Sequence, residues 1–79
     1  MKMRVMIQKT IEVETSNPVF DTLLKLHQYG ACGTDEQYEE ATVVLEGITG
    51  YPVWTAGTKF NEVIAGVYTE DGETVILEY

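Results

Sequence analysis

Residues 61–79, NEVIAGVYTEDGETVILEY, carry the clearest structural signal in the chain and predict a C-terminal β-hairpin. Two runs rich in apolar and β-branched residues flank the polar turn Glu70-Asp71-Gly72. A short turn that contains Asp-Gly between two such runs is the strongest local signal for a pair of antiparallel strands. We expect the rest of the chain to be built around this hairpin.

Two registers of the hairpin are open. A two-residue loop at Asp71-Gly72 pairs Val67 with Ile76 and Tyr68 with Val75, and leaves both faces mixed. A three-residue loop, Glu70-Asp71-Gly72, with Gly72 in the left-handed conformation, separates the faces better, and a buried face selects such a register. We therefore favour the three-residue loop. One face then carries Val63, Ala65, Val67, Val75, Leu77 and Tyr79, and the other carries Ile64, Gly66, Tyr68, Thr74, Ile76 and Glu78.

The second face of this predicted hairpin is more apolar than expected. A sheet covered on one side normally presents polar residues on the other, but Ile64, Tyr68 and Ile76 would lie there. We expect another part of the chain, or a partner, to cover them.

Length and composition predict a single small globular domain over residues 1–79. One cysteine, Cys32, excludes an internal disulfide and favours a reducing, cytoplasmic setting. The first nine residues lack the apolar run of a signal peptide, and no stretch is long enough to span a membrane. We expect no membrane association.

The N-terminal residues predict one half-buried strand, because apolar residues alternate with polar ones. The apolar set is Met3, Val5, Ile7, Ile11 and Val13. Lys9 and Met6 interrupt the alternation, so we expect a bulge near Gln8 to Thr10 or an edge position.

Two helices follow. Asn17 or Ser16 caps the first, Pro18 lies in its first turn, and Gly30 ends it. The predicted inward stripe of this helix is Phe20, Leu23, Leu24 and His27, widened by Val19 and Leu26. Thr34 and Gln37 form a capping box for the second, which ends at Gly50. Its predicted inward stripe is Tyr38, Ala41, Thr42, Leu45 and Ile48, broadened by Val43 and Val44.

Residues 52–60 predict a short extended piece, Val53 to Thr55, and a turn at Gly57. The element order is then β-α-α-(β)-β-β. Consecutive helices between strands favour an α+β fold, with a three- to four-stranded, mainly antiparallel sheet and both helices on one face.

No catalytic, metal or cofactor site is predicted. Cys32 and His27 are the only pair that suggests nucleophilic catalysis, and no third orienting group is identifiable. One cysteine and one histidine cannot build a structural zinc site, and the acidic turn lacks the ligand spacing of a calcium loop. We therefore expect no enzyme activity and no cofactor.

The charge is unevenly distributed. The chain has thirteen acidic and five basic residues, and from Thr10 onward thirteen acids face two bases, a local balance of 2 − 13 = −11. Such a surface repels nucleic acid and attracts basic protein surfaces. Two acidic groups are candidates for contact with a partner: Asp35, Glu36, Glu39, Glu40 and Glu46 in the second helix, and Glu70, Asp71 and Glu73 at the hairpin tip.

Aromatic residues near the hairpin are further candidates. Tyr51, Trp54 and Phe60 crowd the segment before it, and Tyr68 lies on its apolar second face. Trp54 and Tyr68 suit an interface, since Trp and Tyr are favoured at interface hot spots. Sealing the end of a small core is the competing role for the aromatic residues of the first segment.

Two classes of function fit these features. The first is an acidic protein-binding module that docks on a basic, nucleic-acid-binding surface of a larger protein, as phage or mobile-element inhibitors of restriction or CRISPR nucleases do. That parallel rests on size and charge alone. The second is a structural domain without catalytic activity that forms a homodimer through a sheet edge or the apolar hairpin face.

Overall fold

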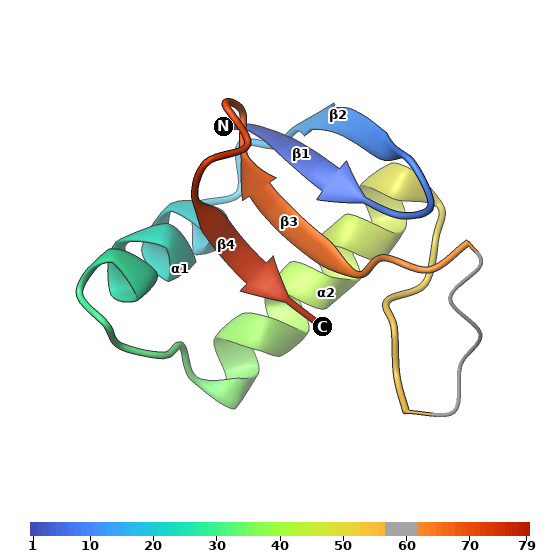
Figure 1. The fold of residues 1–79 in the computed structure, drawn as a ribbon. Helices are drawn as coiled ribbons and strands as arrows, with labels where there is room; N and C mark the ends of the chain where they lie inside the picture. The colour runs from blue at the N-terminus through green and yellow to red at the C-terminus, as the bar shows by residue number, and fades with distance from the viewer. Residues whose placement is uncertain (57–61) are drawn as a thin grey trace.

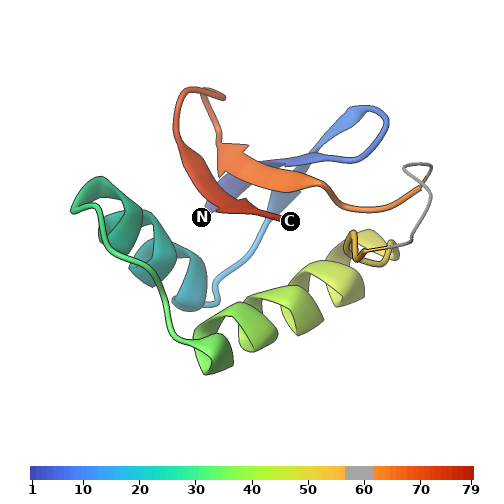
Figure 2. The same cartoon turned by 60° about the horizontal axis from the view of Figure 1, so that its bottom comes forward.

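The computed structural model describes residues 1–56 and 62–79 and has one antiparallel sheet with two helices packed on one face (Figure 1; Figure 2). The elements are β1 (Lys2–Met6), β2 (Thr10–Glu14), α1 (Val19–Gln28), α2 (Asp35–Thr49), β3 (Gly66–Thr69) and β4 (Val75–Glu78). The four strands lie in the order β2-β1-β3-β4. The predicted α+β class, with both helices on one face and a C-terminal hairpin, is confirmed.

The N-terminal segment folds as a hairpin, so the prediction of one bulged strand is wrong. β1 pairs with β2 from Lys2 opposite Glu14 to Met6 opposite Thr10, and residues 7–9 form the turn between them. Because this turn has three residues, Met3 pairs with Val13 and Val5 pairs with Ile11, and all four side chains lie on the same face of the sheet. Alternation along the sequence is therefore the same for one long strand and for this hairpin. Lys9 lies in the turn.

The C-terminal hairpin has a different register from the one favoured above. Its loop contains four residues, 70–73, because the Thr69 N–H donates to the Thr74 carbonyl at 2.9 Å. Tyr68 lies opposite Val75, as in the two-residue alternative, but Val67 lies opposite Leu77. Ile76 is thus an extra residue, a β-bulge in β4.

This bulge accounts for the unexpected apolar residues. It lets the neighbours Ile76 and Leu77 both enter the core, where they are 0% and 2% exposed. Ile64 is also fully buried, in the segment before β3. The prediction that Ile64 and Ile76 lie on the outer face is therefore wrong, and Val75 lies there instead, opposite Tyr68.

The segment before β3 adds no strand to the sheet. Val53 makes only an isolated parallel bridge to Ile64, with Trp54 N–H donating to the Ile64 carbonyl at 2.9 Å and Ile64 N–H to the Pro52 carbonyl at 2.7 Å. The optional strand at residues 53–55 is thus reduced to one bridge. The predicted turn at Gly57 and the position of Phe60 lie outside the described residues.

Three of the four helix ends lie where their local signals predict. The exception is the start of α1, where Pro18 occupies the N-cap position without a side-chain cap hydrogen bond, so the predicted cap at Asn17 or Ser16 is wrong. Asn17 Oδ1 accepts from the Val19 N–H at 2.9 Å at the start of α1, and Gly30, with φ +73°, follows its end. Thr34 and Gln37 form the reciprocal capping box of α2, which ends at Gly50. These signals depend on residues close in sequence, so they are predictable.

One core lies between the sheet and the helices. Its buried apolar residues are Met3, Val5, Val19, Phe20, Leu23, Ala41, Leu45, Val63, Ile64, Val67, Ile76 and Leu77. Three predicted members of the helical stripes are wrong, because His27, Val43 and Ile48 are exposed. His27 and Ile48 lie in the last turns of α1 and α2, whereas Val43 lies on the side of α2 opposite the buried Ala41 and Leu45.

The other face of the sheet carries no helix within the described residues (Figure 2). We call it the open face. Its residues, taken from the strand registers, are Lys2, Arg4, Met6, Thr10, Glu12, Glu14, Gly66, Tyr68, Val75 and Glu78.

Two glycines give a matched test of the core. A methyl group added at Gly33 would lie 2.5 Å from Cδ2 of the fully buried Leu23, whereas one added at Gly47, in α2, would meet no atom within 4 Å. We expect Gly33→Ala to lower the free energy of unfolding by about 1–3 kcal/mol through overpacking. Gly47→Ala should raise it by about 0.5–1 kcal/mol through helix propensity. Urea unfolding followed by circular dichroism measures both, and equal effects of the two substitutions would contradict the predicted packing.

Candidate functional site

The outer side of α2 is a continuous acidic surface. Glu36, Glu39, Glu40 and Glu46 are exposed, and their spacing places them on one side of the helix, opposite the buried Ala41 and Leu45. Asp35 is exposed in the first turn of the same helix. We call Glu36, Glu39, Glu40, Val43 and Glu46 the acidic face of α2.

Val43 lies in the middle of this face. It is 65% exposed and stands four residues after Glu39, three after Glu40 and three before Glu46, so all three carboxylates are its helical neighbours. A single exposed valine is ordinary. An apolar side chain ringed by carboxylates nevertheless offers a partner both a contact point and surrounding charge.

No basic side chain balances the acidic face from within the helix. The sequence of α2, DEQYEEATVVLEGIT, contains neither Lys, Arg nor His. Like charges four residues apart, such as Glu36 with Glu40, each destabilise a helix by a few tenths of a kcal/mol, roughly. Asp35 and Glu36 at the N-terminus offset part of this cost through the helix dipole, whereas Glu46 in the last turns does not.

Glu46 also acts on Tyr79, the residue that follows β4. The Tyr79 hydroxyl shares a 2.7 Å hydrogen bond with Thr42 Oγ1. Burial raises the pKa of Tyr79 above its ordinary value, and the charge of Glu46 raises it further. This contact joins Tyr79 to the side of α2, next to the acidic face.

The hairpin tip is a second acidic group with a different internal structure. Glu70, Asp71 and Glu73 are all exposed. The carboxylate of Asp71 accepts from the Thr69 hydroxyl and from the Glu73 N–H, and Gly72, with φ +76°, donates its N–H to the Thr69 carbonyl at 2.8 Å. Asp71 thus closes the turn, and the carboxylates of Glu70 and Glu73 have no such role.

The two acidic groups do not form one patch. Figure 1 and Figure 2 both place the tip between β3 and β4 far from the start of α2, at opposite sides of the molecule. α2 lies in the helix layer, whereas the tip projects from one end of the sheet. A flat partner surface therefore contacts one group or the other.

The two aromatic candidates also lie apart from the acidic face of α2. Tyr68 is half-buried on the open face, and a methyl group added at Gly66 would lie 3.4 Å from its ring. Trp54 is half-buried in the segment that bridges to Ile64. Neither aromatic residue belongs to α2, so the predicted set of contact residues divides among separate parts of the surface.

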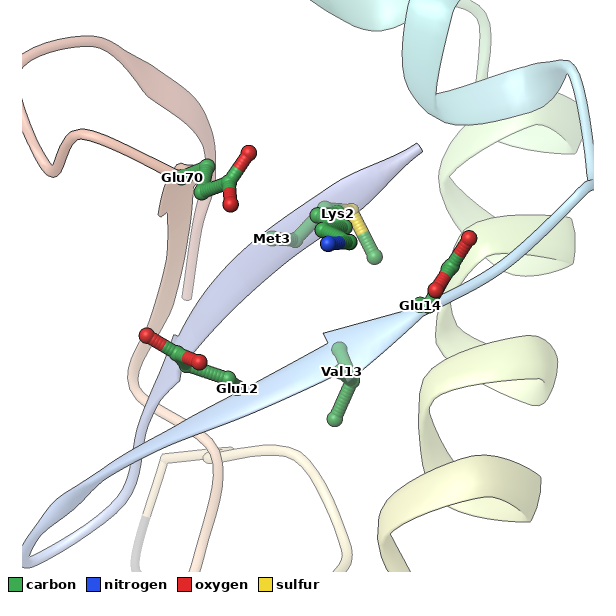
Figure 3. Close-up of a pocket in the computed structure, with 6 residues that line it drawn as sticks. All are labelled: Lys2, Met3, Glu12, Val13, Glu14 and Glu70. Carbon is green, nitrogen blue, oxygen red and sulfur yellow. The ribbon is translucent and has the colours of Figure 1, made fainter.

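Sequence reasoning missed a charged depression at one end of the open face. It has a volume of about 200 Å³, and Figure 3 shows Lys2 at its centre with the carboxylates of Glu12, Glu14 and Glu70 around it. Met3 and Val13 complete the lining. The alternating polar residues of positions 1–14 indicated which side chains share a face. That Lys2 and Glu14 lie opposite each other could be predicted only with knowledge of the turn at residues 7–9.

The described residues provide little for catalysis or metal binding. Cys32 and His27 are both exposed. Across residues 1–56 and 62–79, no three His, Cys, Asp or Glu side chains are grouped to hold a metal ion. Neither helix in that part of the chain is long and apolar enough to cross a membrane.

The pH dependence of the hairpin tip follows from Asp71. The hydrogen bond from Thr69, and next the one from the Glu73 N–H, lower the pKa of Asp71 below its ordinary 3.8. A carboxyl with a lowered pKa stabilises the fold above its unfolded pKa, and that stability is lost as the pH falls through the folded pKa. We expect the Asp71 carboxyl ¹³C resonance to titrate below pH 3.8, and Thr69→Val to move the midpoint upward.

Thr69→Ser is the control, because it keeps the hydroxyl group that donates to Asp71. It should leave the Asp71 midpoint nearly unchanged. A wild-type midpoint at or above 3.8, or one that Thr69→Val does not move, would show that the hydroxyl does not hold the carboxylate.

Comparison with known proteins adds no assignment: no protein-family model, no curated protein and no solved structure matches this chain.

Proposed function

We propose that this protein is an acidic binding module that docks through the acidic face of α2 on a basic surface of a larger protein. The observation that carries the proposal is the set of four exposed glutamates on one side of a helix without a single basic residue, three of them next to the exposed Val43. Charge of one sign steers association with an oppositely charged partner, and an apolar contact at the centre adds affinity after encounter.

A nucleic-acid-binding surface is the preferred partner. Such surfaces are rows of Lys and Arg that neutralise phosphates. Glu36 lies three residues before Glu39 and four before Glu40, so its Cβ atom is about 5–6 Å from each of theirs, and the three exposed carboxylates offer these cations an anionic row along one side of the helix. The module would then act as an inhibitor that occupies a nucleic-acid site, and would not itself bind nucleic acid. A cytoplasmic setting, in which Cys32 stays reduced, fits this role.

Two observations count against the alternative, a domain that self-associates through a sheet edge. The edge strand β2 carries Glu12 and Glu14, and pairing of two copies would bring these like charges close together. The other edge strand, β4, contains the bulge at Ile76, and bulges interrupt the ladder that an added strand needs. Docking through α2 is therefore preferred.

Charge reversal tests the docking surface. The variant Glu36→Lys/Glu39→Lys/Glu40→Lys raises the net charge from −8 to −2, since each change adds two units and 3 × 2 = 6. The control Glu14→Lys/Glu73→Lys/Glu78→Lys makes the same change at exposed positions outside α2. Tagged forms of both, and of the wild type, are used to capture proteins from cells, and each captured protein is then purified for binding measurements.

We expect the wild type and the control to bind a common basic protein, and the α2 variant to lose it. Affinity should fall steeply as salt rises from 50 to 200 mM, roughly the range in which contacts of this kind are screened. A partner that binds the α2 variant as tightly as the control would refute docking through this face.

The central valine provides an independent prediction. Val43→Ser removes the apolar contact at an exposed helical position, so the fold should tolerate it. We expect binding to weaken about five- to tenfold, as for a moderate hot spot, while the slope of log affinity against log salt stays the same. Titration calorimetry at several salt concentrations separates the two quantities. An unchanged affinity would exclude Val43 from the contact.

A further inference from the structure

A second polar feature lies on the open face, on the side of the sheet away from the helices. Arg4, Met6, Thr10, Tyr68 and Gly72 line a groove of about 270 Å³. Arg4 is the only charged residue among them, and it projects from the central strand β1.

The donors of Arg4 are not used within the described structure. Its Nε is buried and has no hydrogen-bond partner, and Arg4 forms no ion pair with any residue in 1–56 or 62–79. A buried donor that stays unpaired is costly, and such groups are rare in folded proteins. In a chain with thirteen carboxylates, an arginine without a counter-ion needs an explanation.

Two neighbouring acidic residues, Glu12 and Asp71, form no ion pair with Arg4. Glu12 lies directly opposite Arg4 in the sheet register but does not pair with it. The carboxylate of Asp71, whose charge does act on Arg4 electrostatically, accepts hydrogen bonds from Thr69 and Glu73 inside the turn. The fold therefore holds Arg4 close to acids without using its donors.

The remaining walls suit the stem of an acidic side chain. Tyr68 lies opposite Arg4 on β3, and Met6, which is 40% exposed, follows two residues later on the same face. The tip leaves room for the guanidinium, since a methyl group added at Gly72 would lie 3.3 Å from its Nη1. Charged donors thus adjoin an apolar and aromatic surface.

We propose that this groove receives one Asp or Glu side chain of a partner protein, with its carboxylate on Arg4 and its aliphatic carbons against Met6 and Tyr68. Because Nε is buried, the carboxylate would bind the two Nη groups, whose N–H groups match its two oxygens bidentately. The volume of the groove is smaller than that of small-molecule sites, which is roughly 300–1,000 Å³, and suits a single side chain. A phosphate, with its higher negative charge, is disfavoured beside Glu12 and the hairpin tip.

Nuclear magnetic resonance titration with a defined probe tests the groove. The probe is N-acetyl-glutamate N-methylamide, and N-acetyl-glutamine N-methylamide is its uncharged counterpart of the same shape. At fixed ionic strength, the glutamate probe should shift the Arg4 Nε–H resonance and the backbone amides of Met6, Thr10, Tyr68 and Gly72. We expect saturation in the millimolar range, and no saturable shift with the glutamine probe.

Two variants separate direct contact from general charge. Arg4→Gln should abolish the saturable shifts, and it leaves the fold intact because Arg4 makes no ion pair there. Lys2→Gln removes the same charge from the same strand and face but lines the other depression, so it should keep the affinity within about twofold. Amide spectra of both variants verify the fold.

Several results would overturn the proposal. Shifts that persist in Arg4→Gln, or that Lys2→Gln abolishes equally, would show that the probe follows the general field rather than Arg4. Inorganic phosphate that binds more tightly than the glutamate probe would assign the groove to phosphate groups. The same shifts on raising the concentration of the protein alone would assign it to carboxylates of a second copy.

Discussion

Burial of one face of β1 is the constraint on which the rest of the structure depends. This strand lies between β2 and β3, and it buries Met3 and Val5 almost completely. Its register with both neighbours places Val67 opposite Val5, and Ile11 and Val13 on the same side. Both helices then have one continuous apolar surface to cover. The same strand presents Lys2 and Arg4 on its other side, so the bases of the first residues are placed on the open face by the demands of the core.

Local signals predicted more of the fold than periodic ones did. The capping box at Thr34 and Gln37 and the stop at Gly30 are properties of a few adjacent residues, and both are present in the structure. The turn at residues 7–9 has no glycine, asparagine or proline to indicate it. Because it contains an odd number of residues, the alternation of apolar and polar residues continues unchanged across it. The bulge at Ile76 is likewise invisible to a period of two, because a bulge changes the pairing of one strand with another.

The candidate surfaces were predictable in composition but not in arrangement. Carboxylates are rarely buried, so exposure of Glu36, Glu39 and Glu40 follows from residue type alone. Val43 was expected to broaden the inward stripe of α2, but it lies two residues from both Ala41 and Leu45, and helical spacing places it on the opposite, exposed side. The sequence did not indicate Arg4 as a site residue, because the absence of an ion-pair partner depends on which side chains surround it in the folded protein. Two surfaces of opposite character therefore result, an acidic helix on one side and an arginine groove on the other.

The exposed thiol of Cys32 has a practical consequence for solution work. It lies in the connector between α1 and α2, with no second cysteine in the chain to oxidise against. Under air, two molecules can join through an intermolecular disulfide, because an accessible thiol lacks the protection of burial. The covalent dimer would carry two acidic helices on one particle and could be mistaken for natural self-association. A reductant, or the isosteric Cys32→Ser protein, is thus a condition for interpreting any measured molecular mass.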